Sequence, residues 1–247
     1  MGSAVKMKLK NIEATLFDLF DTLLLIKKVD EDIGEKCVRN VYTFLSNNGI
    51  SVSYEVFRKS YSEVRKQIYE RPGAELEEPH FCIRLAKTLQ NIGFDYDADS
   101  PLVRRAAEAY MEELSRYVYL DAEAIPLLQK IRSSGYKTGV ISNFSIPEGA
   151  RKLIDIHGIK DFLDTIVISG EINRRKPSPE IFIRALNNLG VDASKAVFIG
   201  DTPDIDIEGA KKVGMKTILI KRRDEKKTEE SRPDFIVSSL KEILELL

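Results

Sequence analysis

The pattern of apolar and polar residues changes along this chain. It starts with a single strand-like run, and later helical and strand-like segments alternate regularly. The run Ala14–Phe17 is apolar, and polar residues follow it at Asp18 and Asp21. A short apolar run with polar residues behind it predicts a buried parallel strand that delivers Asp18 to its carboxyl end.

Residues 31–119 have a helical pattern throughout. The first apolar stripe at helical spacing ends at the Asn-Asn-Gly sequence of residues 47–49, and Ser53 is a candidate N-cap for a second helix. Residues 80–91 predict a third helix, and the Ser-Pro pair that opens residues 100–117 predicts a fourth. Four helices without a strand predict a small all-helical insert.

From residue 121 onward, helical and strand-like segments alternate. We expect helices at 121–134, 146–157, 178–189 and 205–213 and at the C-terminus, and strands at 136–141, 165–169, 196–199, 216–220 and 235–237. This alternation predicts an α/β fold with a Rossmann-like, doubly wound and mostly parallel sheet. The expected domains are a core of residues 1–26 and 120–247 and a helical insert of residues 27–119.

Composition narrows the class of partner. The chain of 247 residues has 38 Lys+Arg against 39 Asp+Glu, so its net charge of −1 gives no reason to expect nucleic acid or a membrane surface as partner. A small metabolite remains open, and so does the oligomeric state. The chain has two cysteines far apart, no apolar run near the roughly 20 residues of a membrane span, and a polar start. These features predict a cytoplasmic protein.

Two groups of charged residues are expected to be solvated. The charged stretch 221–232 predicts a loop exposed to solvent. The same expectation holds for the arginines of the insert, although any one of them could bind a substrate anion: Arg39, Arg65, Arg84 and Arg104.

Polar residues that could take part in catalysis or metal binding follow four separate predicted strands. A lone aspartate after a strand is usually a turn former or an N-cap. Four such positions in one doubly wound sheet predict a shared site, because ligands of these sheets bind beyond the carboxyl ends of the strands. The residues are Asp18, the pair Ser142-Asn143, Lys176, and Asp201 with Asp206.

These residue types suit phosphoryl transfer. Asp18 is the candidate nucleophile, because a desolvated carboxylate beside a metal ion can attack phosphorus. Mg²⁺ prefers carboxylate, phosphate and water oxygens. Asp18 and Asp201 are its expected ligands, and Asp206 is a candidate third ligand. Lys176 would balance charge, while the Ser142 hydroxyl and a backbone N–H would donate to phosphoryl oxygens. The expected substrate is therefore a small phosphorylated molecule.

In this order the motifs resemble those of the haloacid dehalogenase superfamily of hydrolases. They are the Asp-x-x-x-Thr sequence from Asp18 to Thr22, the Ser142-Asn143 step, residues 169–182 around Lys176, and residues 198–210 around Asp201. The resemblance implies a covalent aspartyl intermediate at Asp18 and a Mg²⁺ ion held by Asp201. It also implies hydrogen bonds from Thr22 and Ser142 around the phosphoryl group, a charge-fixing Lys176, and a helical insert that closes as a mobile cap.

The chain departs from the pattern of this family at Phe20. Phosphatases that it resembles usually have there a second aspartate, which acts as general acid and base, whereas the metal contact at that position uses a backbone carbonyl that Phe20 could retain. Loss of acid–base assistance typically costs about 10²–10⁴-fold, mostly on poor leaving groups. Asp21 could replace the missing acid, but adjacent side chains of an extended segment point in opposite directions, and Asp21 could equally be a turn residue.

This departure keeps two alternatives open. Dehalogenases of the superfamily also lack the second aspartate and act on 2-haloacids without a metal, although they usually lack the Gly-Asp sequence that this chain has at Gly200-Asp201. A catalytically reduced binding or regulatory protein is the other alternative. The retained metal residues favour a Mg²⁺-dependent phosphatase.

Overall fold

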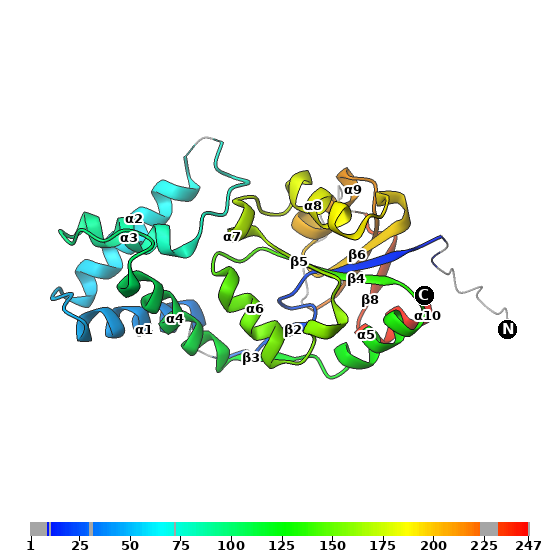
Figure 1. The fold of residues 1–247 in the computed structure, drawn as a ribbon, viewed down its shortest axis with the longest axis horizontal. Helices are drawn as coiled ribbons and strands as arrows, with labels where there is room; N and C mark the ends of the chain where they lie inside the picture. Colours follow the sequence, from blue (N-terminus) through cyan, green and yellow to red (C-terminus); the bar gives the residue numbers. More distant parts are fainter. Residues whose placement is uncertain (1–8, 10, 30–31, 72, 223–231, 247) are drawn as a thin grey trace.

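The computed structural model describes residues 9, 11–29, 32–71, 73–222 and 232–246, and a parallel sheet forms the centre of its larger part (Figure 1). In this described part the sheet has six strands in the order β5-β4-β1-β6-β7-β8, all parallel. The strands are β1 (Ala14–Phe17), β4 (Lys137–Ser142), β5 (Thr165–Ile168), β6 (Ala196–Gly200), β7 (Lys216–Ile220) and β8 (Phe235–Val237). The predicted Rossmann-like α/β fold is confirmed.

Strand β1 lies where the strand order reverses. It pairs with β4 on one side and with β6 on the other, so the carboxyl ends of three strands that are distant in sequence are neighbours. All four residues of β1 are buried, because helices cover both faces of the sheet. Leu16 packs in one hydrophobic cluster and Phe17 in the other, which explains why the strand is apolar at consecutive positions.

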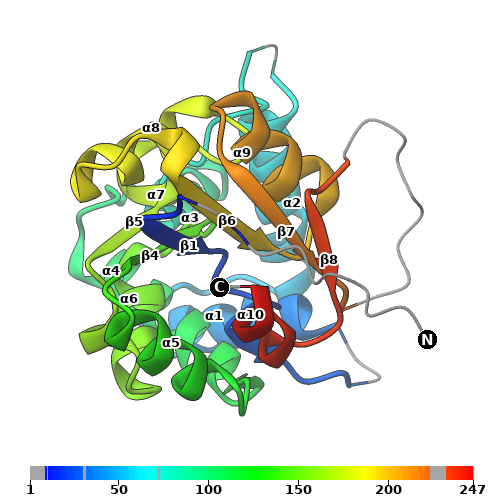
Figure 2. The same cartoon turned by 90° about the vertical axis from the view of Figure 1, so that its right-hand side faces the viewer.

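Two groups of helices cover the two faces of the sheet (Figure 2). Helices α8 and α9 pack in the cluster that contains Leu16, and α5, α6 and α10 pack in the cluster that contains Phe17. Their bounds are α5 (Ala124–Ser133), α6 (Pro147–Ile156), α8 (Pro179–Leu189), α9 (Glu208–Lys212) and α10 (Leu240–Leu246). Shorter helical segments are α7 (Ser169–Ile172), two 3-10 turns at Lys160–Phe162 and Ala193–Lys195, and a π-helical turn at Pro203–Ile207.

Helices α1 to α4 form the insert, beside the carboxyl end of the sheet (Figure 1). The Ser53 hydroxyl accepts a hydrogen bond from Val56 N, and the Ser100 hydroxyl accepts one from Val103 N, so both predicted N-caps are confirmed. The helices are α1 (Ile33–Asn47), α2 (Tyr54–Tyr69), α3 (Phe81–Asn91) and α4 (Pro101–Ser115). None of the helices in the described part of the chain is both long and apolar enough to cross a membrane.

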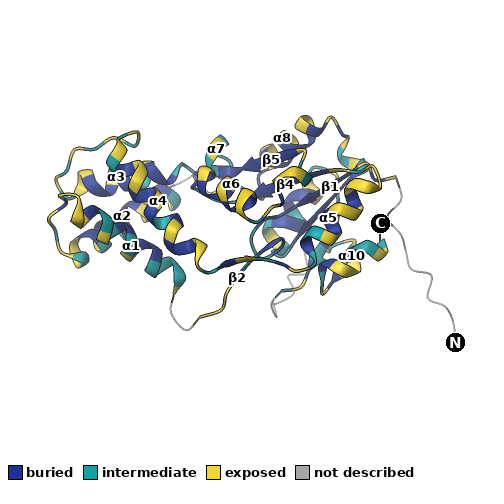
Figure 3. Cartoon of the chain, turned by 60° about the horizontal axis from the view of Figure 1, so that its bottom comes forward, coloured by how far each residue is buried: buried dark blue, intermediate teal, exposed yellow. Residues whose placement is uncertain are grey.

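The prediction of a helical pattern as far as residue 119 is wrong at its end. Helix α4 (Figure 3) stops at Ser115, and β3 (Val118–Leu120) pairs antiparallel with β2 (Leu24–Ile26) (Figure 1). Each strand has three residues and its partner lies more than ninety residues away, so neither produces a local pattern. The predicted domain limits fall at the end of β2 and inside β3, and the division into two domains stays a prediction.

The close packing of β4 against its neighbours gives a test of the fold. A Cβ atom at Gly139 would lie 2.4 Å from Thr165 Cγ2 and 2.7 Å from Leu16 Cδ2. We expect Gly139→Ala to lower the free energy of unfolding by roughly 1–3 kcal/mol, because the added methyl group overpacks the sheet. Urea denaturation measures this, with Ile236→Ala, at an exposed position, expected within about 0.5 kcal/mol of wild type. Equal stability of all three proteins would contradict the packing.

Candidate active site

A buried lysine joins two aspartates at the carboxyl end of the sheet. Lys176 Nζ lies 2.5 Å from Asp18 Oδ1 and 2.6 Å from Asp206 Oδ1, and the lysine is only 2% exposed. Asp18 follows β1 directly, and its backbone N–H donates to the Ile199 carbonyl of β6. The structure thus brings together residues that the sequence places after three different strands.

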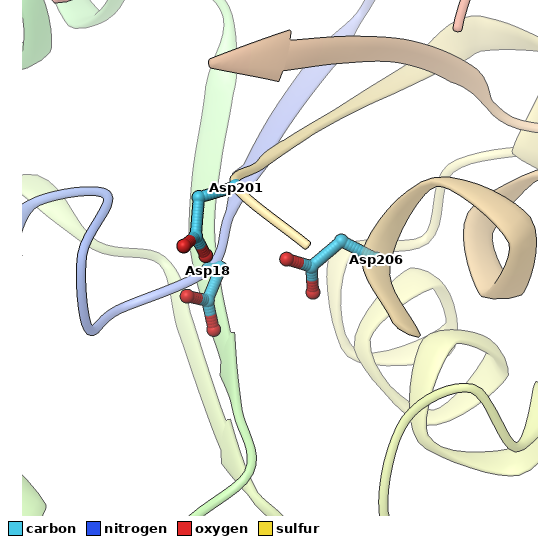
Figure 4. Close-up of side chains that lie close together, drawn as sticks. All are labelled: Asp18, Asp201 and Asp206. Atoms are coloured by element: carbon cyan, nitrogen blue, oxygen red, sulfur yellow. The ribbon is translucent and has the colours of Figure 1, made fainter. Parts of the chain in front are cut away.

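Asp201 completes a cluster of three carboxylates. One oxygen atom from each of Asp18, Asp201 and Asp206 lies within 4.8 Å of the others (Figure 4). Figure 4 shows the Asp18 and Asp201 side chains close together and the Asp206 carboxylate directed toward them from a separate segment. Such a set of hard oxygen atoms matches the preference of Mg²⁺, so the residues fit the ion that the sequence predicts.

The charges of this cluster are unbalanced. Burial, together with the nearby Asp206 and Asp201, raises the pKa of Asp18 to about 8, although Lys176 acts to lower it. Burial acts to lower the pKa of the Lys176 ammonium, but Asp18 and Asp206 raise it, and the net shift is upward. Three carboxylates around one ammonium leave an excess of negative charge, which a divalent cation would balance.

Gly200 allows Asp206 to reach the end of β6. A Cβ atom at Gly200 would lie 2.4 Å from Asp206 Oδ2, so any side chain there would displace this carboxylate. The turn of residues 202–206 holds it in place, because Asp206 N donates to the Thr202 carbonyl and Thr202 N donates to Asp206 Oδ2. The glycine of the Gly-Asp sequence therefore has a steric role, since it leaves room for the Asp206 carboxylate, while Asp201 supplies a carboxylate of its own.

Asn143 contacts the backbone of Lys176 with both ends of its amide. Its Nδ2 donates to the Lys176 carbonyl at 3.0 Å, and its Oδ1 accepts from Lys176 N at 2.7 Å. The next peptide bond, from Lys176 to Pro177, is cis. Asn143 thus fixes the lysine backbone beside the end of β4, and this contact could not be read from the sequence.

Two hydroxyl groups at the site are buried without a partner. Within the described residues, Thr22 Oγ1 and Ser142 Oγ have no hydrogen-bond partner, and both side chains are fully buried. Thr15 and Thr138 share this condition inside β1 and β4. A buried polar group left unpaired costs about 1–3 kcal/mol, so a ligand oxygen beside Thr22 or Ser142 would relieve it.

Phe20 and Asp21 lie in a turn and not in an extended segment. Asp21 has a φ of 56°, in the left-handed region, and its N–H donates to the Leu24 carbonyl. The argument from alternating side chains therefore does not apply to Asp21, and its role as general acid stays a prediction. The Phe20 ring packs against Phe144 with a centroid distance of 5.0 Å, and the metal contact of its carbonyl stays a prediction.

Arg222 anchors this turn, and the sequence reading missed it. Its guanidinium donates to the carbonyls of Asp21 and Thr22 and pairs with Asp121 at 2.6 Å. The predicted solvated loop 221–232 is therefore wrong at Arg222, whose side chain is 17% exposed, and residues 223–231 lie outside the described residues. Its position two residues beyond β7 was the available signal, because the end of β7 lies at the same edge of the sheet as Asp18.

The insert touches the two loops that hold Ser142 and Lys176. Arg175, the neighbour of Lys176, pairs with Glu78 at 3.5 Å, and its N–H donates to the Leu76 carbonyl. At the start of α3, Phe81 N donates to the Ser145 carbonyl. Both loops therefore have direct partners on the insert.

Comparison with known proteins agrees with this arrangement. A model of the haloacid dehalogenase-like hydrolase family matches residues 12–214. A glyceraldehyde 3-phosphate phosphatase of Methanopyrus kandleri is 32% identical over 240 residues, which are 96% of this chain and 97% of that protein. A protein of the same name from Pyrococcus abyssi is 31% identical over 85% of this chain and 82% of its own length.

Among solved structures, a 2-haloacid dehalogenase of Pseudomonas syringae is 25% identical with a TM-score of 0.72, over 95% of this chain and 97% of that one. The match to the family model spans most of the chain, including Asp18, Lys176 and Asp201. The chain therefore belongs to the haloacid dehalogenase-like hydrolases.

Proposed function

We propose that this hydrolase is a Mg²⁺-dependent phosphatase of a small phosphorylated metabolite and works through an aspartyl-phosphate at Asp18. One observation carries the proposal, the cluster of Asp18, Asp201 and Asp206 with Lys176 bonded to two of them. Two relatives that align over most of this chain are named phosphatases of glyceraldehyde 3-phosphate, which supports a phosphate monoester as the substrate class.

The reaction has two displacement steps at phosphorus. An oxygen of the Asp18 carboxylate forms a bond to phosphorus while the bond to the leaving alcohol breaks, and the alcohol oxygen takes the electron pair and a proton. Water then attacks phosphorus and loses a proton to solvent while the bond between phosphorus and Asp18 breaks, which releases inorganic phosphate and restores the Asp18 carboxylate. Asp18, Asp201 and Asp206, with the backbone carbonyl of Phe20, would hold a Mg²⁺ ion, which would neutralise charge on the phosphate.

Other residues of the chain orient the reacting groups. Lys176 favours the ionised form of Asp18 and holds it in position through its 2.5 Å contact, and Asn143 acts through Lys176 as a positioning residue. The unpaired hydroxyls of Thr22 and Ser142 are donors for phosphoryl oxygens. Transfer of the proton to the leaving group falls to Asp21 or to water, because Phe20 cannot donate.

A metal-independent dehalogenase is the second candidate. The phenylalanine at position 20 favours it, and so does the likeness to the Pseudomonas syringae structure. Asp201 and Asp206 argue against it, because halide displacement from a haloacid needs no carboxylate pair around a cation.

The metal and the nucleophile can be tested together on p-nitrophenyl phosphate. We expect hydrolysis with Mg²⁺, loss of it with EDTA, and at least a roughly 10³-fold lower kcat in Asp18→Asn, which removes the nucleophile but keeps its shape. Activity that EDTA leaves unchanged would contradict the metal. Chloride release from 2-chloropropionate would instead support the dehalogenase.

The Mg²⁺ site is tested by a pair of variants in one loop. Asp201→Asn should raise the Mg²⁺ concentration for half-maximal activity at least about tenfold, because it removes a charged ligand. Asp204→Asn, at an exposed position three residues away, should leave that concentration unchanged. Calorimetric titration of both variants with Mg²⁺ gives the same comparison without turnover. Identical affinities would place the ion elsewhere.

The role of Asp21 is tested by the choice of leaving group. If Asp21 protonates the leaving alcohol, Asp21→Asn should lower kcat/KM for an alkyl phosphate about 10²–10⁴-fold and for p-nitrophenyl phosphate far less, since nitrophenolate leaves without a proton. The aryl ester is the internal control for folding and metal binding. A similar loss on both esters would show that Asp21 only shapes the turn.

A further inference from the structure

Arg84 of helix α3 is held at the boundary between the insert and the sheet. Its Nη1 donates to the Tyr61 hydroxyl at 3.0 Å, and its Nη2 donates to Ser145 Oγ at 3.3 Å. The guanidinium carbon lies 4.9 Å from the centre of the Phe81 ring and 5.6 Å from that of Tyr69. The side chain is half-buried, so the expectation of a solvated charge is wrong for this residue.

No carboxylate of the described residues lies within ion-pair distance of Arg84. Two other arginines have carboxylate partners, since Arg58 pairs with Glu35 and Arg175 pairs with Glu78. Arg84 has five N–H donors, and two of them have partners in the described part of the chain. A half-buried guanidinium without a counter-ion favours an anionic ligand, because the charge has lost part of its hydration.

The contacts of Arg84 place it beside the candidate active site. Ser145 lies three residues beyond Ser142, in the loop that follows β4, and Phe81 N donates to the Ser145 carbonyl. In the same loop, the Phe144 ring packs on Phe20, two residues from Asp18. A substrate whose phosphoryl group lies at Asp18 would therefore extend its leaving group toward the insert at this loop.

We propose that Arg84 determines specificity by binding a carboxylate on the leaving-group part of the substrate, an inference that rests on the proposed phosphatase function. The planar fork of a guanidinium matches the two oxygens of a carboxylate. The aromatic rings offset part of the lost hydration through cation–π attraction and fix the plane of the group. The phosphoryl group stays with Asp18 and Lys176, so the two anionic ends of the substrate have separate partners.

The test compares substrates that share a three-carbon skeleton, 3-phosphoglycerate with a carboxylate and glycerol 3-phosphate with an alcohol. Arg84→Gln should lower kcat/KM for 3-phosphoglycerate roughly 10–100-fold and for glycerol 3-phosphate less than about threefold. The reason is that a hydrogen bond from Arg84 to a charged carboxylate is stronger than one to a neutral alcohol. Arg84→Lys should recover part of the loss. Arg65→Gln, an exposed arginine of α2, should change neither value.

Binding is measured in the Asp18→Asn background by calorimetry with both compounds, so the result does not require turnover. Weaker binding of 3-phosphoglycerate alone in Arg84→Gln supports the proposal, and thermal melting of each variant checks its fold. Equal losses for the two compounds, or no preference of the parent protein for the carboxylate, would overturn it. If Arg84→Gln does not fold, the same ratio for Arg84→Lys decides. If the protein does not hydrolyse p-nitrophenyl phosphate but still binds 3-phosphoglycerate more tightly than glycerol 3-phosphate, the phosphatase function is refuted. Arg84 would then remain a carboxylate-binding residue.

Discussion

The contact of the buried Lys176 ammonium with Asp18 and Asp206 is the constraint on which the site depends. A buried charge is costly unless partners and hydrogen bonds compensate it, and this lysine has a carboxylate on two sides. The bond to Asp18 joins residues 158 positions apart, and Asp206 reaches the same ammonium because β6 is the neighbour of β1 in the sheet. Gly200 admits Asp206 to its place, and Asn143 holds the lysine backbone.

That contact leaves the cluster with more negative than positive charge. The raised pKa of Asp18 shows the energetic cost, because burial and two further carboxylates oppose its ionisation. Residues chosen only for stability would not gather in this way, and sites that violate the rules of stable packing are commonly functional. A cation between the carboxylates would remove the repulsion and restore Asp18 as an ionised nucleophile.

The sequence predicted the sheet and the residues at its edge, because parallel strands bring their carboxyl ends to one place. Asp18, Lys176 and Asp201 were found by that rule without knowledge of strand order. The same rule could have indicated Arg222, which follows β7, but its charged neighbours suggested a solvated loop. Contacts that depend on distant partners, such as the pairing of β2 with β3 and the burial of Arg84, have no local signal.

The insert contacts two loops that border the candidate active site. Its partners on the sheet side are Ser145, three residues after Ser142, and Arg175, which directly precedes Lys176. These contacts are polar, and a polar contact exchanged for water changes the free energy by only about 0.5–1.5 kcal/mol. A carboxylate bound at Arg84 would add a bond between insert and site that is present only with the substrate. Binding of the leaving group at Arg84 would then hold the insert against the site, and it would exclude water from Asp18 at the same time.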